Sequence, residues 1–466
     1  MAEQVSRRAV LAGTIAIAAA SRVRAGVARS GPNILFIMAD DLGYADLSCY
    51  GRRDFKTPNI DRLAAQGMRF TQAYANSAVC SATRTALITG RYQERLAVGL
   101  EEPVGGRDVG IPPSHPTLPS LLREAGYETA LIGKWHLGPL PKFGPLQSGY
   151  QHFWGYRGGA VDYFTHGLTG HADLWDGDTP VEAAGYMTDL LGERAVKTVA
   201  DFATLGRPFL LSLHFSAPHW PWEGPTDAVE SQRLKAAKDV EQFMDFDSGS
   251  QATYAAMVTR MDEQVGQVLA ALDRHGLAGN TVVVFTSDNG GERFSDTWPF
   301  SGHKTELLEG GLRIPAIVRW PSRVRAGTTS DAQIISMDWL PTLLAAAGTR
   351  PNAAYRPDGL DITPALLGGA LPERALYWRY MHLAQRACRR GDWKYLKIAG
   401  NEFLFDVARD PLERANLKAR EPQRFAALRS AWEAWNKTML PLDPKSNTGG
   451  FDAHELADHF GVSPDN

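Results

Sequence analysis

Four apolar runs, far apart in the chain, each lead directly into a short polar segment, and this pattern limits the fold more than any other feature. The runs occupy residues 33–38, 127–132, 208–215 and 280–287, and the segments that follow are ADDLGY, GKWHLG, SAPHWP and DNGG. Short apolar runs bounded by turn residues predict buried strands. Because ligand sites of open α/β sheets lie beyond the carboxyl ends of the strands, we expect the four segments to meet in space.

Segments with helical spacing of apolar residues separate these runs. The first has Thr57 as its predicted N-cap and Pro58 in its first turn, and it stops at Gly67. Two longer segments lie at residues 188–206 and 251–277. Alternating strands and helices predict an α/β fold with a large, mostly parallel sheet sandwiched by helices.

The pattern changes after residue 350. Residues 392–407 read as two strands with a turn at Gly400-Asn401, and residues 421–439 read as an amphipathic helix. These features predict a smaller C-terminal α+β domain with an antiparallel sheet. We therefore divide the chain into an export signal, a catalytic domain and a C-terminal domain with its tail, at residues 1–25, 31–350 and 351–466.

The composition and net charge of the chain limit the kinds of partner that it can be expected to bind. The chain has 466 residues, 44% of them hydrophobic, which is enough for a substantial core. A formal net charge of -3, with both signs well mixed, gives no reason to expect binding to nucleic acid or to a membrane surface. Recognition of an anion would therefore need a local cluster of cations.

The N-terminus predicts export. Arg7 and Arg8 precede an alanine-rich apolar segment, and small residues near Ala20 or Ala25 are candidate cleavage points. The apolar segment is shorter than the roughly 20 residues that a membrane-spanning helix needs, so we expect no stable membrane span. The paired arginines resemble a twin-arginine (Tat) signal, which predicts the Tat export machinery as a partner and a periplasmic location.

Two of the predicted strand ends carry oxygen ligands. Asp40 and Asp41 follow one buried strand, and Asp288 and Asn289 follow another. Buried carboxylates need positive charge nearby, and a set of oxygen ligands favours Ca²⁺, with Mg²⁺ second, over Zn²⁺.

Cationic and imidazole side chains follow two of the other predicted strands, at Lys134, His136 and His219. Arg84 lies one helical turn past Cys80, and Lys304 lies in the segment SGHKTELLEGG. Each of them alone would more often be a solvated or packing residue. Together with the acidic set they indicate an anion bound between a metal and cations.

The segment CSATRTALITG, residues 80–90, resembles the signature of the type I sulfatases of the alkaline phosphatase superfamily. In that family the cysteine of a C-x-P/A-x-R frame is oxidised to formylglycine (3-oxoalanine) before folding is complete. Other blocks resemble the family in the same order, among them NILFIMADDLGYADL, TPNIDRLAAQGMRFTQAYA, FTSDNGG and LLEGGLRIPAIVRWP. Ala82 replaces the more usual proline of the signature.

This resemblance implies a set of residue roles. One Ca²⁺ would be bound by the modified Cys80 together with Asp40, Asp41, Asp288 and Asn289. Arg84 and Lys134 would orient the formylglycine, and His136 would act on its second hydroxyl. His219 and Lys304 would face the sulfate and the leaving oxygen.

The chemistry agrees with that modification. A thiolate that attacked sulfate would leave an ester with no internal route for release, whereas a hydrated aldehyde offers one hydroxyl for attack and a second for expulsion of sulfate. The resemblance thus implies a sulfuric ester hydrolase, an arylsulfatase or carbohydrate sulfatase, that acts on small-molecule or saccharide sulfate esters. It also implies a formylglycine-generating enzyme as a partner.

Two alternatives stay open from sequence alone. A phosphonate monoester or phosphodiester hydrolase resembles the sulfatases in fold, metal site and formylglycine. An exported binding protein would instead keep Cys80 unmodified, with a Cys49–Cys80 disulfide as one outcome.

Several aromatic side chains in loops near the predicted site are candidates for stacking on a sugar or aryl ring, with core or surface packing as the alternative. They are Tyr163, His166, Trp220, Trp222 and Trp298.

Overall fold

The computed structural model describes residues 31–103, 107–244, 246, 248–442, 446 and 449–450. The predicted export signal, residues 1–25, lies outside the described residues. Among the described residues, no helix is both long enough and apolar enough to cross a bilayer.

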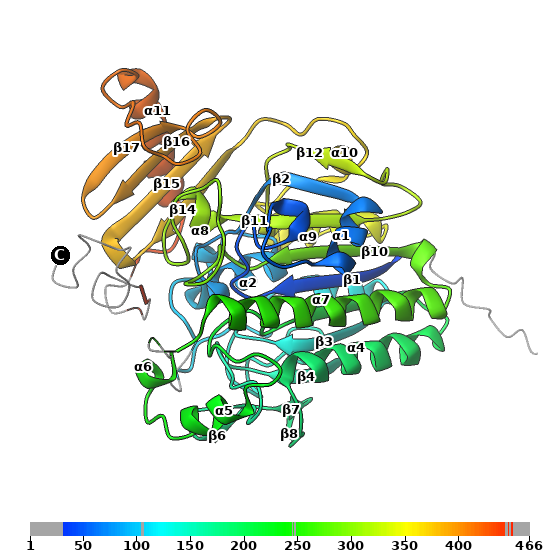
Figure 1. The fold of residues 1–466 in the computed structure, drawn as a ribbon. Helices are drawn as coiled ribbons and strands as arrows, with labels where there is room; N and C mark the ends of the chain where they lie inside the picture. Colours follow the sequence, from blue (N-terminus) through cyan, green and yellow to red (C-terminus); the bar gives the residue numbers. More distant parts are fainter. Residues whose placement is uncertain are drawn as a thin grey trace, which may run out of the picture.

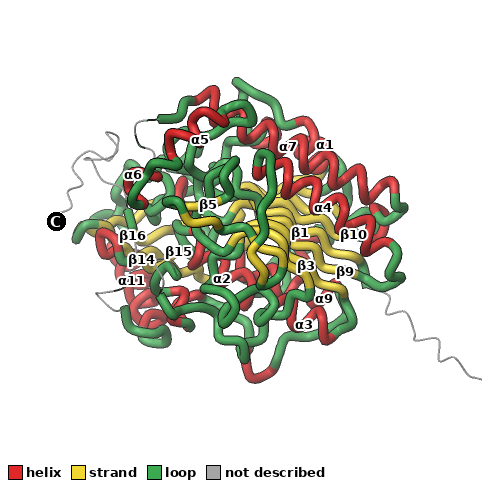
Figure 2. The backbone as a smooth tube through the Cα atoms, turned by 90° about the horizontal axis from the view of Figure 1, so that it is seen from below, coloured by secondary structure: helices red, strands yellow, loops and turns green. Residues whose placement is uncertain are grey.

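A large mixed sheet forms the centre of the molecule (Figures 1 and 2). Across the sheet the order is β12 (Thr328–Ser330), β2 (Met68–Tyr74), β11 (Arg313–Arg319), β10 (Thr281–Ser287), β1 (Asn33–Ala39), β9 (Phe209–His214), β3 (Glu128–Lys134), β4 (His152–Tyr156), β7 (Trp175–Asp176) and β8 (Thr179–Pro180), with β13 (Ile334–Ile335) also paired to β2. The five strands from β10 to β4 are parallel, and β11, β7 and β8 add antiparallel pairs at either side. The predicted fold class is confirmed.

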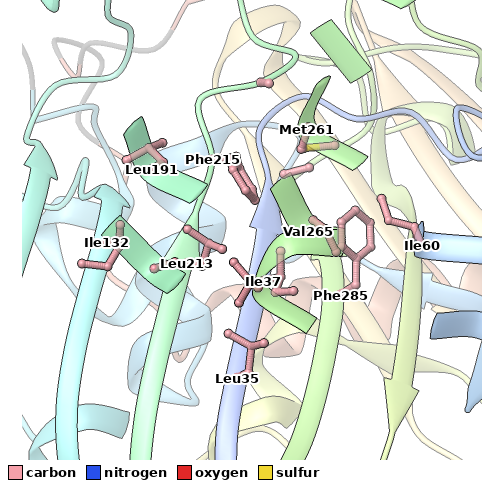
Figure 3. Packing of buried hydrophobic residues seen from close by; sticks show 14 of the residues in the cluster. Leu35, Ile37, Ile60, Ile132, Leu191, Leu213, Phe215, Met261, Val265 and Phe285 are labelled. Atoms are coloured by element: carbon pink, nitrogen blue, oxygen red, sulfur yellow. The ribbon is translucent and has the colours of Figure 1, made fainter. Parts of the chain in front are cut away.

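Alternate side chains of β1 enter two separate hydrophobic cores. Leu35 and Ile37 pack on one face of the sheet with Met261 of the long helix α7 (Gln251–Arg274), as Figure 3 shows. This core also contains residues of α1 (Pro58–Ala65) and α4 (Met187–Ala203). Ile34, Phe36 and Met38 enter the opposite core, which is covered by α2 (Cys80–Thr89), α3 (Leu118–Glu124) and α9 (Trp339–Ala346). The period of two along the strand therefore fixes both layers.

Shorter elements complete the fold. They are α5 (Ala228–Leu234), α6 (Val240–Phe243), α8 (Glu309–Leu312), α10 (Thr363–Leu366), the two-stranded ribbon of β5 (Gly167–Leu168) and β6 (His171–Ala172), and the 3₁₀ turns η1 (Ser48–Tyr50), η2 (Gln93–Arg95), η3 (Ala97–Gly99), η4 (Ala278–Asn280), η5 (Ser336–Asp338), η6 (Ala353–Tyr355) and η7 (His382–Ala384).

Helix α1 begins where predicted, but Thr57 does not cap it with its side chain. The Thr57 hydroxyl instead accepts a hydrogen bond from the Ser48 N–H at 3.0 Å. The free N–H groups of Asn59 and Ile60 donate to the Asp262 carboxylate of α7 at 3.1 and 2.8 Å. A carboxylate from a neighbouring helix thus satisfies the first turn of α1.

A second, four-stranded antiparallel sheet follows the large domain in the chain and lies beside it in Figure 1. Its strands are β14 (Ala375–Tyr380), β15 (Gln385–Arg390), β16 (Trp393–Ile398) and β17 (Asn401–Asp406), packed with α11 (Pro422–Asn436). The predicted β16–β17 turn is shifted by one residue, because Asn401 already belongs to β17. Ala399 and Gly400 form the turn with φ of 47° and 78°, the left-handed backbone that matches the twist of a hairpin.

Buried charges join this sheet to the large domain. Glu309, at the start of α8, accepts hydrogen bonds from Tyr74 at 2.6 Å and from Lys394 of β16 at 3.1 Å. Its carboxylate also contacts Arg313 at 3.0 Å and Arg389 at 3.3 Å. All of these side chains are buried, so we expect the carboxylate to be indispensable to the cations around it.

We predict that Glu309→Gln lowers the free energy of unfolding by about 3–5 kcal/mol, since it leaves the buried Arg313 and Arg389 without their carboxylate partner. Urea unfolding followed by near-UV circular dichroism measures this. The control is Asp201→Asn, which breaks the exposed pair between Lys197 and Asp201 and is expected to cost less than about 0.5 kcal/mol. Equal losses in the two variants would contradict the assigned role of Glu309.

Candidate active site

The four polar segments meet at the carboxyl edge of the central strands, as predicted. Asp40 and Asp41 follow β1, and Asp288 and Asn289 follow the adjacent β10. Lys134 is the last residue of β3. The structure joins these to Cys80, Arg84, His136, His219 and Lys304 through the contacts described below.

Cys80 is the first residue of α2, with Val79 as the N-cap in an extended conformation. Its side chain is buried, and all three cysteines are free, so the Cys49–Cys80 disulfide is absent. Burial raises the pKa of the Cys80 thiol well above its usual value. Potential ligand atoms that all lie within 4.8 Å of one another come from Asp40, Asp41, Cys80 and His219.

Asp40 and Asp288 are held by buried cations. Lys134 Nζ lies 2.5 Å from Asp40 Oδ2, and Arg84 Nη2 lies 2.8 Å from Asp288 Oδ2. Burial, and next the neighbouring Asp288, raise the pKa of Asp40 to about 8. Burial acts in the same direction on Asp288, but Arg84 and Lys134 outweigh it and lower the pKa of that carboxyl. The negative charge of Asp40 is therefore only partly compensated, although cations lie beside both carboxylates.

Asp41 and Asn289 complete the acidic set. Asn289 Nδ2 donates to Asp41 Oδ1 at 2.7 Å, and Lys304 Nζ donates to Asp41 Oδ2 at 2.6 Å. Asp41 has a φ of 62°, a left-handed conformation that turns the chain sharply after β1. Asp40 Oδ1 and Asn289 Oδ1 are buried without a hydrogen-bond partner. Unpartnered buried oxygens beside a thiol and carboxylates are the expected features of a cation site.

His136 is buried, and neither of its ring nitrogens has a hydrogen-bond partner. Burial, followed by the charge of Lys134, lowers its pKa well below the usual range, so the imidazole is neutral. The backbone of His136 has a φ of 54°. A Cβ on Gly159 would lie 2.8 Å from His136 Cε1 and 2.9 Å from Nε2, so glycine at position 159 makes room for this ring.

His219 and Lys304 form a pair. His219 Nδ1 lies 2.7 Å from the Trp220 carbonyl, which only accepts, so Nδ1 carries the proton. The other nitrogen, Nε2, therefore accepts from Lys304 Nζ at 3.2 Å. Burial, and then Lys304, lower the pKa of His219 well below its usual value. Lys304 is the positively charged member of the pair. The Asp41 carboxylate outweighs burial and raises the pKa of the Lys304 ammonium group well above the ordinary value.

Two further residues support the site in roles that the sequence did not predict. His214, the last residue of β9, lies with Nδ1 3.2 Å from the Lys134 carbonyl and 3.4 Å from Arg84 Nη1. The Tyr163 hydroxyl donates to the His219 carbonyl at 2.9 Å. His214 was counted as part of an apolar strand, although its place at the strand end was a signal that could have found it.

The five candidate stacking residues differ in how much of each side chain is exposed to solvent. Tyr163, His166 and Trp222 are buried, which excludes stacking on a substrate in this conformation. Trp220 is half-buried, with its ring centroid 4.4 Å from that of His219 and 6.2 Å from that of Phe243. Trp298 is 66% exposed.

Residues 32–349 match a family model described as Sulfatase. N-acetylgalactosamine-6-sulfatase of Canis lupus familiaris is 33% identical, over 78% of this chain and 71% of the relative. Arylsulfatase J of Mus musculus is 28% identical, over 91% of this chain and 80% of the relative. The chain belongs to the sulfatase family. It is a sulfuric ester hydrolase.

Solved structures show the same fold. A crystal structure of Ps i-CgsB has a TM-score of 0.81 and 29% identity, over 92% of this chain and 96% of that chain. Phosphonate monoester hydrolase of Agrobacterium radiobacter has a TM-score of 0.62 and 21% identity, over 90% of this chain and the whole of that chain. At that identity the second likeness shows the fold alone.

We predict that Gly159→Ala lowers kcat/KM for an aryl sulfate by about ten- to a hundredfold, because the added methyl displaces the His136 ring. Steady-state kinetics measures the loss. The control is Gly279→Ala, whose added Cβ meets no atom within 4 Å and should leave kcat/KM unchanged. Full activity of Gly159→Ala would show that this position of His136 is not required.

Proposed function

We propose that this protein hydrolyses sulfate monoesters of saccharides, with a formylglycine made from Cys80 as the nucleophile and one bound Ca²⁺. The observation that carries the proposal is the placement of Cys80 at the start of a buried helix, among the converging carboxylates. Arg84, one helical turn further on, reaches the same cluster through Asp288.

The residues present fit a calcium ion. Asp40, Asp41, Asp288 and Asn289, with the modified Cys80, would hold it, and two of their buried oxygens lack a partner. When bound, the ion would supply positive charge that lowers the pKa of a ligated hydroxyl and stabilises charge on sulfate oxygens. It would also offset the burial and the neighbouring Asp288 charge that raise the pKa of Asp40.

Formation of the formylglycine has to precede folding. Cys80 is only 2% exposed, so a formylglycine-generating enzyme needs the chain before α2 is buried. The hydrated aldehyde would supply one hydroxyl for attack on sulfur and a second for release of sulfate. We extend the proposal to a Tat signal at residues 1–25 and a periplasmic location, since the Tat route carries proteins that fold before export.

Arg84, Lys134 and Lys304 give the site its affinity for an anion. Each is buried and reaches the cluster through a carboxylate, and fixed buried cations stabilise charge that develops on sulfate oxygens. His136 is suited to accept a proton from a hydroxyl of the nucleophile, because its neutral ring has two unpartnered nitrogens.

Lys304 and His219 would protonate the leaving oxygen. Lys304 carries the proton, and His219 Nε2 accepts from it at 3.2 Å. The pair can therefore deliver one proton to the alkoxide, and the two residues can share the proton that replaces it. The sequence left His219 and Lys304 as equal candidates for the acid, and the hydrogen-bond directions favour Lys304.

A saccharide is the proposed substrate class. The relatives include N-acetylgalactosamine-6-sulfatase, and Ps i-CgsB was also solved in complex with k-i-k-neocarrahexaose, with a TM-score of 0.80 and 28% identity over 92% of this chain and 97% of that chain.

The first test compares two esters with the same aryl leaving group. We expect the protein, co-produced with a formylglycine-generating enzyme, to turn over an aryl sulfate at least a hundredfold faster than the matching phosphate diester. The fixed cations suit sulfate oxygens, and the family match supports the sulfate ester. The measurement is kcat/KM for each ester.

Mass spectrometry of the Cys80 peptide accompanies this assay, and Cys80→Ala is the inactive control. Preference for the phosphate diester would contradict the proposal and would assign the protein to the phosphonate and phosphodiester hydrolases. Sulfate turnover with only a thiol at Cys80 would refute the formylglycine.

The second test concerns the metal. Asp288→Ala is expected to weaken Ca²⁺ binding by at least a hundredfold and to abolish the rise in Tm that Ca²⁺ causes in the wild type, because a ligand and the partner of Arg84 are both lost. Isothermal titration calorimetry and thermal unfolding measure these effects without reference to activity.

The control for the metal test is Asp178→Ala, which removes an exposed carboxylate and should bind Ca²⁺ like the wild type. Undiminished Ca²⁺ binding by Asp288→Ala would remove this residue from the ligand set.

A further inference from the structure

We propose that Trp298 is a stacking platform for a saccharide ring beyond the one that carries the sulfate ester, so that the preferred substrate is an oligosaccharide rather than a monosaccharide. This inference rests on the proposed saccharide sulfatase function and names the substrate class more narrowly. It depends on the exposure of the indole, on the fixed backbone beneath it, and on the course of its loop between two predicted site residues, Asn289 and Lys304.

Trp298 differs from the other tryptophans in exposure. The chain has twelve, all in the part that the structure describes. Eleven of them are buried or half-buried, while Trp298 is 66% exposed. Among the described residues its indole packs against no other aromatic ring and makes no hydrogen bond. A single exposed apolar side chain is common on protein surfaces, so the inference depends on the fixed loop and on its course between site residues as well as on exposure.

The backbone beneath the indole is fixed by hydrogen bonds. The Trp298 N–H donates to Asp296 Oδ1 at 2.9 Å, and the Asp296 N–H donates to the buried Asp46 at 2.8 Å. The Phe300 N–H then closes the turn on the Thr297 carbonyl at 2.9 Å. Side chains on both sides of Trp298 are buried, since Thr297 and Phe300 are only 6% and 7% exposed. The backbone of this loop is therefore already ordered before a ring binds, and the indole side chain is the part left to be immobilised.

The loop that carries Trp298 borders the active site at both ends. It leaves β10 through Asn289 and returns at Lys304, whose N–H donates to the Gly291 carbonyl at 2.9 Å. Its middle lies against the segment after Asp41, because the Ala45 N–H donates to the Asp296 carbonyl at 2.8 Å. The loop that carries Trp298 therefore begins beside the predicted metal ligands and ends beside a residue predicted to face the leaving oxygen.

The chemistry of the platform fits a sugar ring. An indole offers a flat apolar face with a negative quadrupole, which matches the partly positive C–H groups on one face of a pyranose. Of the aromatic candidates at the site, Tyr163, His166 and Trp222 are buried, and Trp220 is half-buried between His219 and Phe243. A ring joined to the sulfated residue therefore has Trp298 as the open aromatic face among these candidates.

The test measures KM for sulfated oligosaccharides of two, four and six residues, containing galactose sulfate or N-acetylgalactosamine sulfate, and for a small aryl sulfate. Trp298→Ala should raise KM for the longer oligosaccharides by about tenfold, which equals about 1.4 kcal/mol. It should leave kcat/KM for the aryl sulfate within about twofold of the wild type. Trp298→Phe should restore most of the affinity, and Leu367→Ala, at another exposed apolar side chain, should have no effect.

Three results would overturn the inference. They are a KM that does not depend on Trp298, an equal loss on the aryl sulfate, and a change in the oligomeric state of Trp298→Ala measured by light scattering. Binding of the same oligosaccharides to Cys80→Ala and to Cys80→Ala combined with Trp298→Ala, by calorimetry, decides the question without catalysis. If the wild type cleaves no sulfate ester, the proposed function fails, while this binding comparison still tests the platform.

Discussion

Buried cations paired with buried carboxylates at the carboxyl edge of the sheet are the constraint on which the rest of this structure depends. Arg84 faces Asp288, Lys134 faces Asp40, and Lys304 faces Asp41. Burial of an unpaired charge costs several kcal/mol, so each partner needs the other in place. The partners come from α2, from the loop before α8 and from three strands of one sheet, and the site therefore forms only when these elements are assembled. The charges are nearly balanced, yet Asp40 Oδ1 and Asn289 Oδ1 have no partner. Unpartnered buried oxygens of this kind are the ligand atoms that the proposed Ca²⁺ would use.

Much of this arrangement was predictable from sequence, because it rests on short-range patterns. The period of two in β1, the helical spacing in α7 and the polar residues after each strand are local signals, and parallel topology brings the strand ends together.

The supporting contacts were not predictable, since they join residues that no local pattern relates. Asp262 caps α1 from about 200 positions away, and the Tyr163 hydroxyl holds the His219 carbonyl although the residue reads as a candidate for stacking. His214 was missed for a different reason, because the predicted apolar run extends to residue 215 and so places this histidine inside the strand, whereas β9 ends at His214. Glu309 lies in a family block, but its role appears only with Lys394 and Arg389 beside it.

The C-terminal sheet takes part in building the active site. Gln385 of β15 donates to the Thr305 carbonyl at 2.8 Å and accepts from the Leu307 N–H at 2.7 Å, which holds the segment directly after Lys304. Thr305 in turn donates its N–H to the Ala78 carbonyl at 2.9 Å, two residues before Cys80. One hydrogen-bonded path thus runs from the small sheet through the Lys304 segment to the start of α2. The Glu309 carboxylate anchors the same segment a few residues later.

This path gives the small domain, which contributes none of the predicted catalytic residues, a part in positioning Lys304. Lys304 has a long, flexible side chain, and its ammonium group is useful only if its backbone is fixed relative to Asp41 and His219. Thr305 has a φ of 73°, a conformation that a residue with a Cβ rarely adopts without support from its surroundings. Gln385 and the Ala78 carbonyl supply that support from two sides. The small sheet therefore holds one strained turn, and through that turn it positions Lys304 relative to Asp41 and His219.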